Sequence, residues 1–290
     1  MTKQIQLIQL YCTVCHYHNS TLAAETQRLS NNFRPKFTDE ECITAYLFGI
    51  AEGKFEVKAI YRFILDYWAD WFPDLPRYQN FVRRINLLAP AFKILSQLLM
   101  LETPIDENIR SNLLDSLPII VANQKRSGTA KSANGLCDKG YCASKGIYFY
   151  GVKLHMLGQK RHRALPIPCM MNIAPASEND ITVAKEWLSD VWNLDIYADK
   201  MYANAVWAEE LASRGVTMST PVKLKKGQLF LDSADVYYSA AVSRTRQAIE
   251  SFFNWINVKT RIQYASKVRS DNGLIAFIFA RLSVLTFFYS

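Results

Sequence analysis

The fold is decided by LLDSLPIIV, residues 113–121, an apolar run that contains one carboxylate, Asp115. Its branched apolar residues favour a buried strand. IYFYGVKLHML, residues 147–157, predicts a second strand, and residues 165–174 predict its antiparallel neighbour. A basic loop that contains glycine separates the first strand from the second. Three strands in succession, with no helix between them, therefore begin this part of the chain.

The elements that follow alternate between helix and strand. We expect helices over 178–192, 205–214 (ended by Gly215), 244–259 and 274–289, and strands over 194–199 and 216–222. The order is thus β-β-β-α-β-α-β-α. It predicts an α/β fold with a mixed five-stranded sheet flanked by helices, as in RNase H-like proteins. A fold of this kind does not by itself give a function.

Residues 1–105 show no strand pattern and predict an all-α region. Thr38 and Glu41 form a capping-box pattern at the start of one helix, and further helices are expected over 56–70 and 78–100, the last bent near Pro90. Short connections allow helix-turn-helix packing. Three arginines of this region either face a DNA backbone or solvate the outer surface: Arg77, Arg83 and Arg84. We therefore predict a helical domain over 1–105 and an α/β domain over 106–290.

The charge of the chain is positive and unevenly distributed. The net charge is +8, and the window 123–163 contains nine Lys and Arg residues but one acid, Asp138. Half of the residues are hydrophobic, which excludes a disordered tail. The imbalance indicates a positive surface that would attract a polyanion, although a lysine-rich loop can also serve solubility alone.

The cysteines and the termini indicate a reducing compartment. The N-terminal sequence has no signal-peptide pattern and no run of 18 apolar residues occurs, so we expect a cytoplasmic protein with free thiols and no membrane partner. Residues 274–289 are expected to form a buried terminal helix. One short motif has two interpretations, a metal knuckle or ordinary helix residues: Cys12, Cys15, His16 and His18.

Three carboxylates lie where apolar elements would exclude an unpaired charge. Asp115 lies inside the first strand, Asp199 ends the fourth, and Glu250 lies among apolar neighbours on the helix 244–259. The first and fourth strands are neighbours in an RNase H-like sheet, so the acids could converge into a site for Mg²⁺ or Mn²⁺. Each acid also has a structural interpretation: Asp115 could mark a strand edge, Asp199 could cap a turn, and Glu250 could pair with Arg246, which lies four residues before it. His155 is interpreted as a structural histidine whose hydrogen-bonding groups are satisfied, rather than as a metal ligand.

The sequence resembles DDE-type transposases of bacterial insertion sequences, and most closely the insertion-sequence 982 family. The resemblance covers nearly the whole chain and is carried by four segments in the expected order: DSLPI (115–119), YFYGVKLH (148–155), ADKMY (198–202) and RQAIESFF (246–253). It assigns Asp115, Asp199 and Glu250 as the catalytic, metal-binding acids. Arg246 matches the arginine of the family signature Tyr-x2-Arg-x3-Glu-x6-Lys. The chain departs from the family pattern at three positions: Ser243 for the tyrosine, Asn257 for the lysine (Lys259 follows two residues later) and Met201 for a common glycine.

The resemblance also implies an activity and its partners. It implies metal-dependent phosphodiester cleavage at transposon ends and strand transfer into target DNA, with two Mg²⁺ or Mn²⁺ ions. The partners would be double-stranded DNA and a second copy of the chain, in a homodimer in the bacterial cytoplasm that is nucleoid-associated when bound to DNA. The cations expected to contact DNA phosphates are Lys125, Arg126, Lys200, Lys223, Lys225, Lys226, Arg246 and Lys259. The helical domain would read the terminal repeats.

Two other functions fit the same sequence. A protein of transposase descent could bind DNA as a regulator without catalysis, but the three acids of the site are all present. An RNase H-like nuclease could cut DNA without joining it. Assays of cleavage and of joining separate the three functions.

Overall fold

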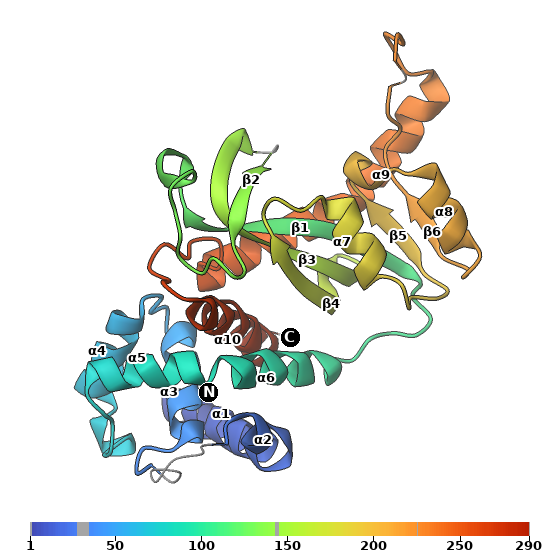
Figure 1. The fold of residues 1–290 in the computed structure, drawn as a ribbon. Coiled ribbons are helices and arrows are strands. Elements are labelled where there is room, and N and C mark those ends of the chain that lie inside the picture. Colours follow the sequence, from blue (N-terminus) through green and yellow to red (C-terminus); the bar gives the residue numbers. More distant parts are fainter. Residues whose placement is uncertain (1, 28–34, 143–144, 225, 290) are drawn as a thin grey trace. The chain divides into compact units, whose positions relative to one another are not determined.

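The computed structural model describes residues 2–27, 35–142, 145–224 and 226–289 (Figure 1). The chain divides into two compact units. The first contains Met1–Thr103, Lys131–Gly135 and Ile256–Ser290, and the second contains Pro104–Ala130 and Leu136–Trp255. The two units therefore do not coincide with the two domains that the sequence predicts on either side of residue 105. The difference arises because the C-terminal segment, Ile256–Ser290, packs with the N-terminal helices.

The first unit is helical. Its elements are α1 (Lys3–Tyr17), η1 (His18–Leu22), α2 (Ala23–Glu25), α3 (Asp39–Ala51), α4 (Val57–Tyr67), η2 (Ala69–Trp71), α5 (Tyr78–Leu87), α6 (Ala89–Leu101) and α10 (Asp271–Tyr289). The capping box at α3 is confirmed: the Thr38 hydroxyl accepts from the Glu41 N–H, and the Glu41 carboxylate accepts from the Thr38 N–H. The break near Pro90 is also confirmed, since α5 and α6 meet at 58° and Pro90 lies in the first turn of α6.

Helix α10 provides much of the core of this unit. It packs against α6 and α3, and its Leu274, Ile278 and Leu282 are buried. Within the described residues, α10 alone among single helices is long and apolar enough to cross a membrane, and the bent pair α5–α6 passes the same test only if taken together. Of the window Asp271–Phe288, 56% is buried inside the structure. That burial is typical of a core helix and agrees with the buried terminal helix that we expect from the sequence.

The second unit is built on a mixed sheet of six strands. Its elements are β1 (Ser111–Ala122), η3 (Gln124–Arg126), β2 (Asp138–Cys142), β3 (Ile147–Arg161), β4 (Ala164–Pro175), α7 (Asp180–Trp187), β5 (Asp195–Ala198), η5 (Lys200–Tyr202), α8 (Ala205–Ala212), β6 (Thr217–Ser219) and α9 (Ser233–Thr260). Helix α9 runs beyond this unit at its C-terminal end. The strand order is β2-β3-β1-β5-β6, and β4 also pairs with β3. Pairs β1–β3, β2–β3 and β3–β4 are antiparallel, whereas β1–β5 and β5–β6 are parallel.

Strand β2 corrects the sequence-based assignment of this segment to a loop. Its residues, DKGYC, begin with two charged side chains and a glycine, so hydrophobic periodicity did not reveal it. Gly140 lies at its centre, directly against the backbone of Ala176, where a side chain would have no room. The sheet therefore has six strands rather than five.

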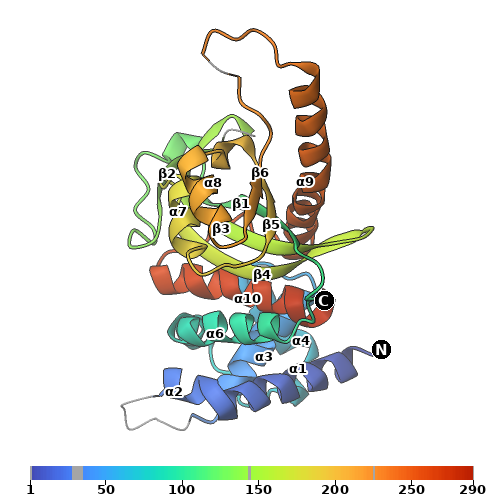
Figure 2. The same ribbon diagram turned by 90° about the vertical axis from the view of Figure 1, so that its right-hand side faces the viewer.

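Helices cover both faces of the sheet. Figure 2 shows α7 and α8 on one side of the strands and α9 on the other. Leu114 of β1 belongs to the core beneath α7 and α8, together with Tyr202 and Trp207. Because side chains alternate along a strand, the next residue, Asp115, points to the opposite face. Helix α9 begins at Ser233 rather than at the expected Arg244, and α8 is followed by Gly215 with a φ of +70°.

Candidate active site

Two of the three predicted acids come to the same place on two neighbouring parallel strands that pair in register. Leu114 of β1 pairs with Ala198 of β5, and each is followed directly by an aspartate. Asp115 lies within β1, whereas Asp199 lies just after β5 and caps η5. The register of the sheet therefore brings Asp115 and Asp199 to the same place, although 84 positions of sequence separate them.

Arg246 of α9 joins the two aspartates to the third acid. Its Nη2 lies 2.9 Å from the Asp115 Oδ2 and 3.6 Å from the Glu250 Oε1, and its Nη1 lies 3.9 Å from the Asp199 Oδ1. The Arg246 side chain is only 10% exposed. One guanidinium thus contacts all three predicted acids, and we call these four residues the acid–arginine cluster.

Burial sets the protonation of Asp115. Removal of the carboxylate from water raises its pKa to about 6, and the charge of Asp199 acts in the same direction. The positive charge of Arg246 and the Ser116 N–H, which donates to Asp115, oppose the shift. A cation near this carboxylate therefore favours its ionised form.

Two of the acids, Asp199 and Glu250, also make the local contacts that a purely structural interpretation predicts. The Asp199 carboxylate accepts a 2.6 Å hydrogen bond from the Lys200 N–H, which caps the turn after β5. Glu250 contacts Arg246 one helical turn away, and its side chain is 61% exposed. Asp115, by contrast, reaches across the fold to Arg246, 131 residues later in the chain.

Within the described residues, no group of three or more His, Cys, Asp or Glu side chains is arranged to hold a metal ion. At the acid–arginine cluster, the guanidinium lies among the carboxylates. The donor set nevertheless fits a hard divalent cation, because carboxylate oxygens are the ligands that Mg²⁺ and Mn²⁺ prefer. These carboxylates already share one cation supplied by the chain itself.

The N-terminal Cys/His motif lies on one helix. Cys12, Cys15 and His16 are part of α1, and His18 begins η1. The His18 ring contacts the Glu40 carboxylate at 3.0 Å and the Thr26 hydroxyl at 3.2 Å. In the described chain these residues lie in helical segments and form no cluster that could hold a metal ion.

Most of the cations predicted to bind DNA are exposed side chains of loops and short turns. Lys125 and Arg126 lie in η3, Lys200 lies in η5, Lys223 and Lys226 follow β6, and Lys259 lies in the last turn of α9. Lys225 lies outside the described residues. Arg246 differs from the others, because its guanidinium is buried against the carboxylates.

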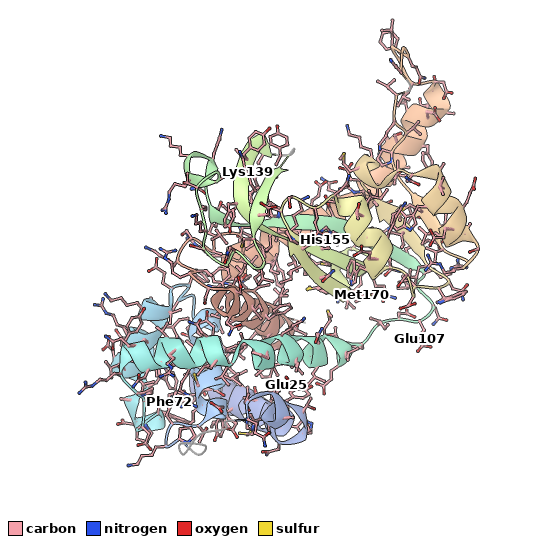
Figure 3. All side chains as sticks on the ribbon, in the orientation of Figure 1. Glu25, Phe72, Glu107, Lys139, His155 and Met170 are labelled. Atoms are coloured by element: carbon pink, nitrogen blue, oxygen red, sulfur yellow. The ribbon has the colours of Figure 1, made fainter. Side chains whose placement is uncertain are left out.

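A second polar cluster lies on the other face of β1, and sequence analysis did not predict it. The Ser116 hydroxyl donates to Asp180 at 3.1 Å, and the Lys153 ammonium contacts the same carboxylate at 2.8 Å. His155 pairs with Ser116 across β1 and β3, is fully buried, and lies within the sheet (Figure 3). The only sequence signal was the period-two spacing of Lys153 and His155 in an apolar strand.

His155 departs from its predicted role as a satisfied structural histidine. Neither ring nitrogen has a hydrogen-bond partner among the described residues. Burial lowers its pKa to about 4, and the charge of Lys153 acts in the same direction against that of Asp180. His155 is therefore a neutral, unpaired histidine at physiological pH.

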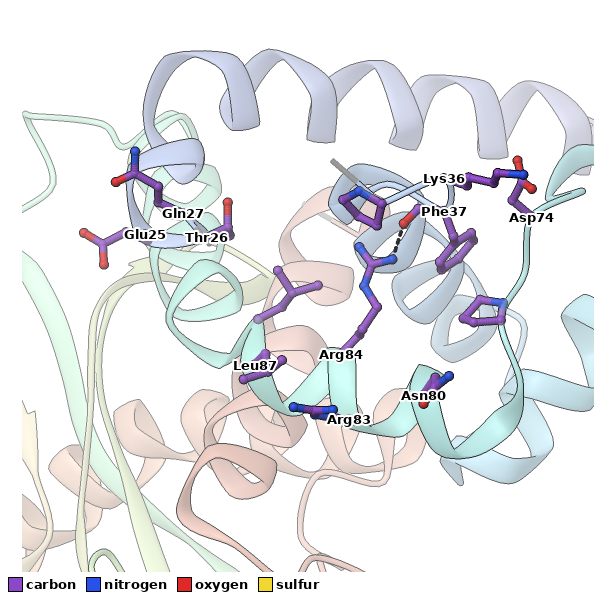
Figure 4. A pocket seen from close by; sticks show the side chains of 13 residues that line it. Glu25, Thr26, Gln27, Lys36, Phe37, Asp74, Asn80, Arg83, Arg84 and Leu87 are labelled. Atoms are coloured by element: carbon purple, nitrogen blue, oxygen red, sulfur yellow. Dashed lines mark hydrogen bonds between the residues drawn. The ribbon is translucent and has the colours of Figure 1, made fainter. Parts of the chain in front are cut away.

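The three arginines of the helical unit are not equivalent. Arg77 and Arg83 are exposed. Arg84 is buried, donates to the Phe37 carbonyl oxygen and forms an ion pair with Asp39, so it holds the chain before α3 against α5 (Figure 4). Figure 4 also shows Arg83 on the lining of a pocket of about 700 Å³ within this unit. Of the three, Arg77 and Arg83 remain available to a ligand.

The comparison with known families decides the class of protein. A family model described as "Transposase DDE domain" matches residues 114–287, which is more than half of the chain. The chain belongs to the transposase DDE domain family. The match begins in β1, one residue before Asp115, and ends in α10, so it spans the acid–arginine cluster of this transposase. Neither a curated protein nor a solved structure matches the chain.

Proposed function

We propose that this transposase cuts the phosphodiester backbone at the ends of a mobile DNA element and joins the freed ends to target DNA. The single observation that carries the proposal is the contact of Asp115, Asp199 and Glu250 with one guanidinium, because it gathers three carboxylates from distant parts of the chain at one point. In this proposal the three acids are catalytic and bind Mg²⁺ or Mn²⁺.

The strand order supports an RNase H-like fold for the second unit. The series β4-β3-β1-β5-β6 contains an antiparallel half and a parallel half that meet at β1. At the junction of these halves, Asp115 lies within β1 and Asp199 lies directly after the neighbouring strand β5. We assign the chain to the insertion-sequence 982 type on the four segments that carry the resemblance, since the family match itself is broader.

The residues of the acid–arginine cluster would have different roles in this reaction. Two metal ions held by the carboxylates would supply activation of the attacking oxygen and stabilisation of the leaving oxygen. Asp115 is fixed by the Ser116 N–H and by Arg246, so its orientation is set before a ligand arrives. Arg246 offsets part of the negative charge of the acids in the metal-free protein and would contact DNA phosphate once released from them.

The other predicted cations would hold the DNA. Lys125, Arg126, Lys223 and Lys226 are exposed, and cations of this kind bind phosphates with little regard to sequence. The remaining proposed contacts come from Lys200, Lys225 and Lys259. Joining requires two element ends at once, so we propose a homodimer on DNA, in the bacterial cytoplasm.

The test uses the purified full-length chain, Mg²⁺ and a labelled duplex that carries an element end. We expect cleavage and transfer into a target duplex by the wild type, and a loss of both of at least about 100-fold in Asp115→Asn and Asp199→Asn. Glu186→Gln, an exposed acid on α7, is the matched control and should retain both activities.

The outcomes separate the competing functions. Equal cleavage by wild type and Asp115→Asn would remove the proposed site. Cleavage without transfer would identify a nuclease, and tight DNA binding without cleavage would identify a regulator. Calorimetry with Mn²⁺ adds a readout independent of turnover, because the two asparagine variants should bind the ion more weakly than the control.

A further inference from the structure

A pocket of about 450 Å³ opens within the helical unit, and none of the residues that we propose above as DNA contacts lines it. It is lined by the turn after α3 and the start of α4, by α5, by the segment 261–273 and by α10. All of these segments belong to the same compact unit. The pocket is therefore a property of this unit alone.

The lining of this pocket is strongly cationic. Five of its residues carry a positive charge and one carries a negative charge, namely Lys54, Arg261, Lys267, Arg269 and Arg281 against Glu56. Among the described residues, none of the five cations forms an ion pair with a carboxylate. An uncompensated set of this kind creates a positive potential that attracts an anion.

Arg281 places one of these charges in the protein interior. Its side chain is fully buried and donates to three carbonyl oxygens, those of Thr260 at 2.9 Å, Phe277 at 3.0 Å and Phe55 at 2.7 Å. Its guanidinium also lies 3.4 Å from the centre of the Phe277 ring. Burial lowers the pKa of Arg281, and the interaction with Tyr46 acts in the opposite direction. A buried charge is screened little by salt, so its field persists in the pocket.

Two of the outer cations, Arg269 and Arg261, are held in place before any ligand arrives. The Arg269 Nη1 donates to the carbonyl oxygens of Ser266 and Val268, and the Arg261 guanidinium lies 5.6 Å from the centre of the Phe55 ring. Lys267 is exposed on the same segment, and Tyr264 beside it is 56% exposed. Clustered cations with an exposed aromatic ring beside them can bind phosphates and stack on a sugar or base.

We propose that this basic pocket, lined by Lys54, Arg261, Lys267, Arg269 and Arg281, binds backbone phosphates of the DNA on which the transposase acts. The inference rests on the proposed function in so far as DNA is the partner. DNA is favoured over a small anion because the cations come from three separate places, with one in segment 53–59, three in segment 261–273 and Arg281 in α10. They therefore present several positive groups to a repeating chain of phosphates. The contact would be sequence-independent, and it would add affinity rather than select a site.

The test measures duplex binding by the full-length chain through fluorescence anisotropy, at several salt concentrations. Lys267→Glu is the main variant because the Lys267 side chain makes no hydrogen bond or ion pair among the described residues, so the fold does not depend on it. We expect affinity to fall about tenfold near 50 mM salt, and the slope of log K against log salt to fall by about 0.9 for each phosphate that the variant no longer binds. Lys54→Gln should give a smaller loss in the same direction. The matched control is Lys93→Glu, an exposed residue of α6 outside the pocket, which makes the same change in charge.

The outcomes distinguish this inference from the proposed function. Equal loss of affinity in Lys267→Glu and Lys93→Glu, or no loss in Lys267→Glu, overturns the pocket as a phosphate site. Competition at the pocket by a polyglutamate peptide but not by an unlabelled duplex would also overturn it, in favour of an acidic protein partner. Cleavage by Asp115→Asn at the wild-type rate would overturn the catalytic proposal. Weaker DNA binding by Lys267→Glu, measured by anisotropy, would still support the pocket even then.

Discussion

Arg246 is the residue on which the candidate site is organised. Its guanidinium touches three carboxylates that the chain could otherwise not hold together without a cation. Sequence analysis predicted all three acids, because each is a charge in an apolar setting. It did not predict their common partner, because an arginine four residues before a glutamate forms a local helix pair in any solvated helix.

Arg246→Gln should tighten the binding of Mn²⁺ by the DNA-free protein. The substitution removes the internal cation that competes with a metal for the carboxylates, so we expect an affinity gain of about tenfold. Isothermal titration calorimetry measures it, with Arg244→Gln, an exposed arginine of the same helix, as the control. Weaker metal binding by Arg246→Gln than by Arg244→Gln would show that the arginine positions the acids instead of competing with metal.

His155→Leu should remove part of the acid sensitivity of the fold. Its pKa is lowered to about 4 in the folded state from an ordinary value of 6.5, so the unfolded chain binds the proton first as the pH falls. The wild type therefore loses about 2 kcal/mol from this group between pH 7.5 and pH 5, and the variant does not. The stability contribution of Asp115 changes with pH in the opposite direction. Because its pKa is raised to about 6 in the folded state, Asp115 stabilises the fold below about pH 4, and this stabilisation is lost as the pH rises through about 6.

Urea denaturation at the two pH values measures this difference. The Asp115 contribution is common to both proteins and cancels when the variant is compared with the wild type. Equal pH dependence of the wild type and His155→Leu would contradict a neutral, buried His155.

At the scale of elements, the sheet positions the site through one register. The pairing of Leu114 with Ala198 places Asp115 and Asp199 side by side, and the sequence pattern predicted both strands. Strand β2 was missed because DKGYC has no apolar periodicity, and its place depends on Gly140 packing against a backbone far along the chain. The cluster of Ser116, Lys153 and Asp180 was missed for a similar reason, since pairs formed across the fold have no local sequence signature.

Gly140→Ala should destabilise the second unit. The added methyl group would meet the carbonyl of Ala176, and overpacking against backbone costs about 1–3 kcal/mol. Gly128→Ala is the matched control, because a methyl group there meets nothing within 4 Å. Thermal unfolding of both variants tests the prediction, which fails if their midpoints shift equally.

At the scale of the whole molecule, the helical unit is assembled from separate parts of the chain. Helix α10 lies more than 160 residues after α6 in sequence but packs against it, and its Leu274, Ile278 and Leu282 are fully or almost fully buried. Sequence analysis identified α10 as a buried helix from its composition. It could not assign the partner of that helix, because an apolar face fits any other apolar face of suitable shape.

A fragment of residues 1–105 should therefore fail to fold cooperatively. It lacks the apolar surface of α10, and each buried Leu or Ile side chain is worth roughly 2 kcal/mol. A fusion of 1–105 to 256–290 through a flexible linker should recover a sharp thermal transition, measured by circular dichroism. A sharp transition in the unfused fragment would show that α10 is dispensable to the helical unit.

The internal cation of the acid–arginine cluster also bears on how this transposase is handled and stored. Proteins whose acids are held together only by bound metal unfold when a chelator removes it. Here the chain supplies its own counter-charge, so prolonged dialysis against EDTA should leave its circular dichroism spectrum unchanged. The acid–arginine cluster would then be assembled in the folded protein before DNA or a divalent ion binds, as the proposed function requires.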